Sequence, residues 1–138
     1  MKYRARLPQL DGRLYLCDGG METALIYLQG ADLPQFASFV LLADEGGRSK
    51  LTEYYENFLP IARSRGTGFV LDTATWRANP DWALQLGYDL PSLKAANEAA
   101  VELCAQLRHK WETPATPIVI DGVIGPRGDG YKAGRMEA

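Results

Sequence analysis

Three short runs of apolar residues along the chain each end in an aspartate and pass directly into a small polar loop. These runs are predicted to be strands and span Leu14–Asp18, Gly68–Asp72 and Pro117–Asp121. The first is apolar almost without alternation, which is typical of a strand that is covered on both faces. Helical periodicity fills most of the sequence between the runs, so the pattern predicts a repeated strand–loop–helix unit.

The repeat predicts where a binding site would lie. Parallel strands joined by helices place their carboxyl ends along one edge of a sheet. We therefore expect the three strands to be neighbours in sequence order, with Asp18, Asp72 and Gly122 close together. Ligands of α/β folds bind at that edge, so the pattern indicates an architecture and a site at once.

The helices are predicted from apolar spacing and from residues that start or stop a helix. The clearest spans residues 91–111, where apolar side chains recur every three or four positions. Another is predicted to begin at Ser49, to kink at Pro60 and to end at Gly66. Shorter helices are predicted over residues 21–29, 36–42 and 79–87.

Three strand–helix units are too few for a closed barrel, because an eightfold (β/α) barrel needs about 250 residues. The chain has 138. The predicted fold class is α/β, consisting of the first three βα units of a truncated TIM (β/α)8 barrel. Residues 1–138 are expected to form this one partial domain, with residues 1–12 as an extended N-terminal arm. The alternative is a small open three-stranded layer with poorly protected edges.

Composition and charge narrow the classes of partner. The net charge is −2 and no run of Lys or Arg occurs, which argues against nucleic acid as a partner. No apolar stretch reaches membrane-spanning length, and the N-terminus does not resemble a signal peptide. Two cysteines without a pairing pattern suit a reducing compartment, so we expect a cytoplasmic protein that binds no membrane.

The loop after the first strand offers the strongest candidate chemistry. Gly19 and Gly20 would let backbone amides approach a ligand closely, and Asp18 beside them could bind an ammonium group. A tight turn, with Asp18 capping the following helix, explains the same residues equally well.

The loops after the other two strands can likewise be interpreted either as parts of a binding site or as ordinary structural loops. Thr73, Thr75 and Trp76 offer two hydroxyls and an aromatic wall beside Asp72, but they also suit strand-end and N-cap hydrogen bonding. The Gly-rich segment 122–128 could shape a backbone cradle. No Gly-Lys-Ser/Thr follows it, so nucleotide binding is not favoured.

The cysteines and the single histidine do not predict a metal site. Cys17 and Cys104 have no Cys or His at metal-ligand spacing, and both are expected in the core. His109 lies in the last turn of a predicted helix, where a surface role suits it.

Three segments resemble motifs of the homocysteine S-methyltransferase family. Residues 18–23 are similar to its Asp-Gly-Gly-Met-Gly-Thr opening, residues 73–76 to its Thr-Asn-Thr-Tyr, and residues 122–128 to its Gly-x-x-Gly-Pro-x-Gly. The segments occur in family order and spacing and cover essentially the whole chain. Glu22, Ala74 and Trp76 replace the family's glycine, asparagine and tyrosine, so the substrate of this chain can differ.

The resemblance implies transfer of a methyl group to the thiol of homocysteine, or of a related thiol or selenol, as in methionine biosynthesis. The partners it implies are a small thiol amino acid and a methyl donor. The residues to which it assigns substrate binding are Asp18, Gly19, Gly20, Thr73, Thr75, Trp76 and Gly122. It also implies zinc in full-length relatives, because zinc stabilises the reactive thiolate. The family's zinc cysteines lie in the later half of the barrel, so no cofactor is expected in this chain.

Different classes of function stay open. The chain resembles part of a methyltransferase that would be inactive alone, needing a C-terminal half or self-association. Alternatively, it is a non-catalytic half-barrel that pairs with itself or with another chain. A weaker third interpretation uses the strand-end aspartates to bind Mg²⁺ in a hydrolase or lyase. Zinc content and thiol methylation assays would separate the three.

Overall fold

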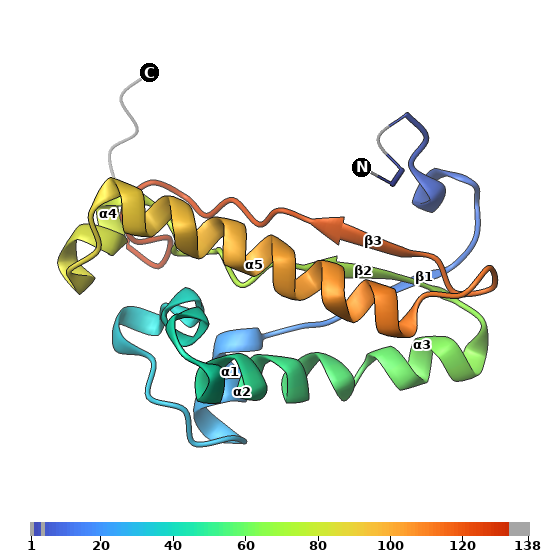
Figure 1. Cartoon of the computed structure of the whole chain (residues 1–138), viewed down its shortest axis with the longest axis horizontal. Coiled ribbons are helices and arrows are strands. Elements are labelled where there is room, and N and C mark those ends of the chain that lie inside the picture. The colour runs from blue at the N-terminus through green and yellow to red at the C-terminus, as the bar shows by residue number, and fades with distance from the viewer. Residues whose placement is uncertain (1, 4, 133–138) are drawn as a thin grey trace.

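The computed structural model describes residues 2, 3 and 5–132 and contains a three-stranded parallel sheet (Figure 1). Its strands are β1 (Tyr15–Cys17), β2 (Gly68–Asp72) and β3 (Ile118–Asp121). They pair in sequence order, β1 with β2 and β2 with β3. The predicted parallel α/β arrangement is therefore confirmed, although β1 and β3 are shorter than predicted.

Five α-helices and four short 3-10 turns connect and flank the strands in the described part of the chain. The helices are α1 (Met21–Tyr27), α2 (Glu45–Glu56), α3 (Leu59–Arg65), α4 (Pro80–Ala83) and α5 (Leu90–Trp111). The 3-10 turns are η1 (Pro8–Leu10), η2 (Pro34–Phe36), η3 (Ser38–Ala43) and η4 (Leu84–Leu86). Within the described residues, no helix is both long enough and apolar enough to cross a membrane.

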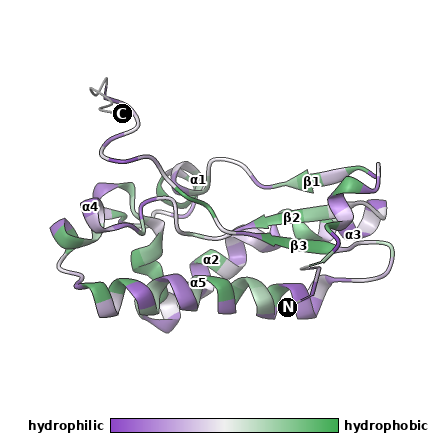
Figure 2. Ribbon diagram, turned by 90° about the horizontal axis from the view of Figure 1, so that it is seen from above, coloured by the Kyte–Doolittle hydropathy of each residue, from purple (hydrophilic) through white to green (hydrophobic). Residues whose placement is uncertain are grey.

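The helices bury one face of the sheet. Helix α3 packs against β2 and α5 against β3, and both run alongside the strands in Figure 1. Phe69 and Ile118 are paired across the sheet and fully buried in the resulting core, and their β1 partner Leu16 packs against the same core. The apolar character of β2 and β3 is visible in Figure 2. This row belongs to a larger core that also takes in residues of the helices, and burial of that core is the main driving force for the fold.

The opposite face of the sheet is more open, which corrects two predictions. Side chains alternate between the faces of a strand, so Tyr15 and Cys17 lie opposite Leu16. Tyr15 is only half-buried and Cys17 is exposed, so β1 is not covered on both faces and Cys17 is not a core residue. Val119 on this face is nevertheless buried. Cys104, in contrast, is fully buried as predicted.

The N-terminal boundary of α2 differs from the prediction. Asp44 is its N-cap, and its carboxylate accepts a hydrogen bond from the Gly47 amide at 2.8 Å. The predicted cap Ser49 lies inside the helix. A β-carbon on Gly47 would lie 2.1 Å from the carbonyl oxygen of Leu41, so this glycine allows η3 to pack closely on α2. The helix predicted over residues 36–42 is η3, a 3-10 segment.

The predicted kink at Pro60 is a complete break. Helix α2 ends at Glu56, and α3 restarts at Leu59 with Pro60 in its first turn, where proline is tolerated. Gly66 ends α3 in the left-handed conformation, with a φ of 62°, as predicted.

The other predicted helices are present with small shifts. Helix α5 starts at Leu90, where the carboxylate of Asp89 accepts a hydrogen bond from the Ser92 amide at 2.8 Å. The segment predicted over residues 79–87 comprises α4 and η4 and is closed by Gly87. The predicted 21–29 helix is α1, which ends at Tyr27.

The N-terminal segment is less extended than predicted, because η1 forms within it. Glu112, directly after α5, accepts hydrogen bonds from Lys2 and from the Tyr3 hydroxyl. The same carboxylate accepts a bond from the Ile118 amide at 3.1 Å. The beginning of the chain is therefore tied to the amino end of β3, away from the strand ends that carry the aspartates.

Candidate functional site

A small pocket of about 170 Å³ lies where β1 and β2 end. Asp18 and Asp72 both line it, as the strand-end pattern predicts. Gly122, predicted to join them, is not among its lining residues. The next residue, Val123, lines the pocket instead. The loops after all three strands therefore meet at one site.

One oxygen of the Asp18 carboxylate is hydrogen-bonded, and the other has no hydrogen-bond partner among the described residues. The Tyr54 hydroxyl donates a hydrogen bond to its Oδ2 at 2.7 Å and also approaches the Gly19 carbonyl oxygen at 3.2 Å. Its Oδ1 is buried and has no hydrogen-bond partner among the described residues. Burial raises the pKa of Asp18, while the Tyr54 hydrogen bond opposes that rise. Asp18, which lines the pocket, therefore has one buried acceptor atom without a partner among the described residues.

Asp72 adds a second carboxylate with a perturbed ionisation. Burial and, secondarily, the negative charges of Asp18 and Asp121 raise the pKa of Asp72 to about 6. Glu22 contributes a further carboxylate to the lining of the small pocket, and none of the described Lys, Arg or His residues lines it. The charge of this pocket thus favours a cationic group such as an ammonium.

Glu22 is an acidic residue where the resembled motif has glycine. Its Oε1 accepts a hydrogen bond from the Ser38 hydroxyl at 2.7 Å, and Ser38 itself is buried. Glu22 is therefore fixed at the boundary of the small pocket, and the substitution makes this site more acidic.

The two glycines after β1 have different structural explanations. Gly20 is the N-cap of α1 and has a φ of 62°, a left-handed conformation that favours glycine. The tight-turn interpretation therefore accounts for Gly20. A β-carbon on Gly19 would meet nothing within 4 Å, so Gly19 leaves open space beside the pocket that both glycines line.

Thr73 and Thr75 form a hydrogen-bonded pair that fixes the loop after β3. Their hydroxyl oxygens lie 2.7 Å apart. Thr73 accepts a hydrogen bond from the Val123 amide at 3.1 Å, and Thr75 donates one to the Val123 carbonyl at 2.8 Å. Thr73 lines the small pocket, whereas Thr75 does not. The observed role of this pair is to join the loops after β2 and β3.

Trp76 lines both the small pocket and a larger cavity of about 830 Å³, and so do Gly20 and Glu22. The larger cavity is formed by the loops after β2 and β3 together with α1, the η2 segment and α4. Trp82, Asp129 and Tyr131 line it, as does Arg77.

Sequence reasoning missed several of these residues. Tyr54 lies within the helix predicted from Ser49 to Gly66, where nothing in the sequence distinguishes it from its neighbours, although its hydroxyl reaches Asp18. Arg77 and Trp82 lie near the Thr-Ala-Thr-Trp segment but carried no separate signal, because their partners are more than 40 residues away.

The described residues do not bring together a metal site. Among them, no group of three or more His, Cys, Asp or Glu side chains is arranged to hold a metal ion. Cys104 is buried near the Asp72 carbonyl, and burial raises the pKa of its thiol to about 12, whereas Cys17 is exposed. His109 is exposed at the end of α5. These residues do not fit the ligand set of a zinc centre, which needs three or four protein ligands.

Comparison with known families identifies the group of proteins concerned. A family model described as homocysteine S-methyltransferase matches residues 15–138. The chain belongs to the homocysteine S-methyltransferase family. No curated protein and no solved structure gives a significant match. The family assignment confirms the resemblance of the three loop motifs, and the structure shows that these motifs meet around one pair of cavities.

Proposed function

We propose that this chain provides the acceptor-binding part of a methyltransferase acting on the thiol of homocysteine or of a related thiol or selenol. The unpartnered, buried Oδ1 of Asp18 is the observation that carries the proposal. An amino acid substrate has an ammonium group that can donate a hydrogen bond to this atom. The family assignment supports a thiol amino acid as that substrate.

The chain's own residues would bind and orient the acceptor. The Tyr54 hydrogen bond favours the charged form of Asp18, which is the form that attracts an ammonium. Asp72 and Glu22 add negative charge at the same pocket. The two substrates of a methyl transfer must lie side by side, so we place the methyl donor in the larger cavity across Trp76.

We propose further that the sheet corresponds to the first three βα units of a (β/α)8 barrel. In that arrangement, Thr75 and Gly122 would contact substrate only together with residues from the rest of the barrel. Three parallel strands in sequence order with the site at their carboxyl ends are consistent with this arrangement. Zinc would be held by residues outside the described part of this chain. We therefore expect the 138-residue chain to bind an acceptor without transferring a methyl group.

Calorimetric titration with homocysteine tests the proposal. Asp18→Asn should lose at least about 2 kcal/mol of binding free energy, because truncating one partner of a buried charge pair typically has that effect. Asp32→Asn, at an exposed aspartate in the loop after α1, is the matched control and should bind like the parent chain.

Two ligand analogues identify which group Asp18 recognises. The deaminated analogue 4-mercaptobutyrate should bind weakly to the parent chain and equally weakly to Asp18→Asn. The analogue 2-aminobutyrate, which keeps the amino group and lacks the thiol, should retain the sensitivity to Asp18→Asn. Equal binding of homocysteine by both proteins would overturn the role proposed for Asp18.

A second candidate function is a non-catalytic half-barrel that pairs with itself or with another chain. The open face of the sheet, with exposed Cys17 and half-buried Tyr15 and Val70, favours this candidate. It predicts association without homocysteine binding, so the calorimetric titration separates it from the first proposal.

A further inference from the structure

Arg77 is a nearly fully buried cation in the wall of the larger cavity, with 7% of its surface exposed. Its guanidinium lies 3.8 Å from the ring centroid of Trp82 and 4.6 Å from that of Trp76. Stacking on indole rings stabilises a guanidinium that has lost contact with water. The protein's own cation therefore occupies the space beside these two rings.

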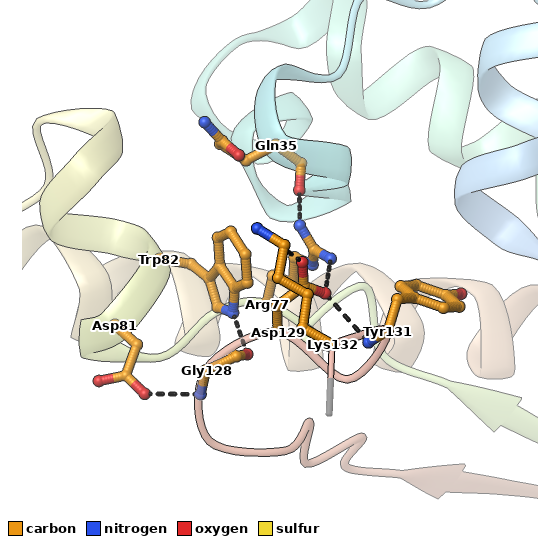
Figure 3. A network of polar contacts seen from close by, with 8 residues as sticks. All are labelled: Gln35, Arg77, Asp81, Trp82, Gly128, Asp129, Tyr131 and Lys132. Atoms are coloured by element: carbon orange, nitrogen blue, oxygen red, sulfur yellow. Dashed lines mark hydrogen bonds and ion pairs between the residues drawn. The ribbon is translucent and has the colours of Figure 1, made fainter. Parts of the chain in front are cut away.

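The polar atoms of Arg77 join two segments that are distant in sequence. One guanidinium nitrogen donates to the Gln35 carbonyl oxygen and another to the Asp129 carboxylate at 3.4 Å (Figure 3). Gln35 and Phe36 have φ values of 56° and 54°, which non-glycine residues rarely adopt. The bond from Arg77 thus ends on a strained backbone segment that needs outside support.

Further contacts extend this connection to the loop after β3. The Trp82 indole donates to the Gly128 carbonyl oxygen at 3.0 Å, and Asp81 accepts from the Gly128 amide at 3.0 Å. Asp129 also accepts from the Tyr131 amide at 3.1 Å. The Tyr131 ring in turn lies edge-on to Trp76, with the centroids 5.9 Å apart.

We propose that Arg77 is a positioning residue that fastens the η2 segment and the loop after β3 to Trp76 and Trp82. It thereby holds the Trp76 indole as the wall between the small pocket and the larger cavity. Lysine cannot replace it, because a single ammonium lacks the planar fork that bonds two partners while stacking on indole. The consequence for substrate binding rests on the proposed function, whereas the fastening of the loops does not.

Amide hydrogen exchange of Arg77→Lys tests the fastening directly. Exchange at the Gly128 and Tyr131 amides, and at the Phe36 amide of η2, should rise together by about tenfold or more, whereas exchange in α5 and in β2 should stay unchanged. Arg63→Lys is the matched control, because exposed Arg63 also stacks on an indole, that of Trp111, away from both cavities. It should leave all of these amides unchanged.

Chemical rescue distinguishes positioning from a general loss of stability. In Arg77→Ala, added ethylguanidinium should restore slow exchange in both segments, and ethylammonium should not. Faster exchange confined to the neighbours of residue 77, an equal rise over the whole chain, or equal rescue by both cations would overturn the proposal.

Homocysteine titration adds the readout that concerns substrate. Arg77→Lys should weaken binding, while Arg63→Lys should not. If the parent chain does not bind homocysteine, the proposed function fails, and the exchange result still decides whether Arg77 fastens the two segments. Arg77→Lys could instead speed amide exchange in these loops and leave the affinity for homocysteine unchanged. That result would show that the position of Trp76 does not affect acceptor binding.

Discussion

The carboxylate of Asp72 gives the site its clearest pH dependence. Its pKa rises from 3.8 to about 6 on folding, so the folded chain holds this proton more tightly than the unfolded chain does. Stability from this group is therefore fully present below pH 3.8 and is lost as the pH rises through about 6. The cause is burial first and repulsion by Asp18 and Asp121 second.

Asp72→Asn should consequently stabilise the chain at pH 8 and not at pH 3.5. The expected gain is about 1 kcal/mol, well below the full value of the shift, because the side chain is partly solvated. Urea unfolding at both pH values measures it. The control Asp32→Asn removes an exposed carboxylate away from the site. A gain for Asp72→Asn that is equal at both pH values would contradict the electrostatic explanation.

Single residues were predictable from the sequence where their role is local. Asp18 and Gly20 could be identified because a strand end and a tight turn leave a signal within a few positions. Trp76 was identified on the same grounds. Tyr54 and Arg77 were not, because their contacts to Asp18, Gln35 and Asp129 depend on how distant segments pack. A side chain of this kind is indistinguishable in sequence from an ordinary helix or loop residue.

At the scale of elements, the start of α2 provides a direct test of helix capping. Asp44→Ala should lower the free energy of unfolding by about 1 kcal/mol, because it removes the side-chain acceptor of the Gly47 amide. Ser49→Ala should change stability little or raise it slightly, because Ser49 lies inside the helix and alanine has the higher helix propensity. Urea unfolding of both variants measures the difference, and the reverse ranking would restore Ser49 as the cap.

Gly125, in the glycine-rich loop after β3, lies too close to the Trp76 backbone to accept a side chain. A β-carbon on Gly125 would lie 2.0 Å from the Trp76 carbonyl oxygen, whereas one on Gly122 would meet nothing within 4 Å. Gly125→Ala should therefore destabilise the chain by about 1–3 kcal/mol, as expected for a forced backbone shift, and Gly122→Ala should be nearly neutral. Thermal unfolding of the two variants measures the contrast, and similar melting temperatures would show that this loop adjusts freely.

Element types were more predictable than their ends. The three strands follow from short apolar runs that end in an aspartate, and the long helix α5 follows from apolar spacing that recurs over residues 91–111. The start of α2 was placed at Ser49 because serine is a favourable N-cap residue, whereas Asp44 caps the helix and Gly47, which packs closely against Leu41, lies inside it. The break before Pro60 was predicted only as a kink, since proline is compatible with either a bent helix or the first turn of a new one.

At the scale of the whole molecule, the parallel sheet explains why the three motifs lie together at one edge. The in-register pair of Asp72 and Asp121 places the ends of β2 and β3 side by side, and β1 brings Asp18 to the same edge. Strand order and direction followed from the repeat in the sequence. The uneven covering of the sheet did not, because a run of apolar residues does not reveal whether helices will pack on one face or on both.

That uneven covering predicts self-association of the 138-residue chain. Strand β1 is an edge strand, and an open edge beside half-buried apolar side chains favours pairing with another chain. Under reducing conditions, which prevent disulfide formation by exposed Cys17, sedimentation should show association that increases with concentration. Cys17→Lys places a charge on this face and should shift the chain toward monomer, because burying an unpaired ammonium between two chains is unfavourable.

Gln106→Lys adds the same charge on the exposed side of α5 and should leave the association unchanged. A concentration-independent monomer with a cooperative melting transition would contradict the prediction and indicate that the open face is stable in water. If both lysine variants weakened association equally, the contact would lie elsewhere, or the effect would come from the change in net charge alone. Only a loss of association that is specific to Cys17→Lys would identify the uncovered face of the sheet as the surface through which the chain associates.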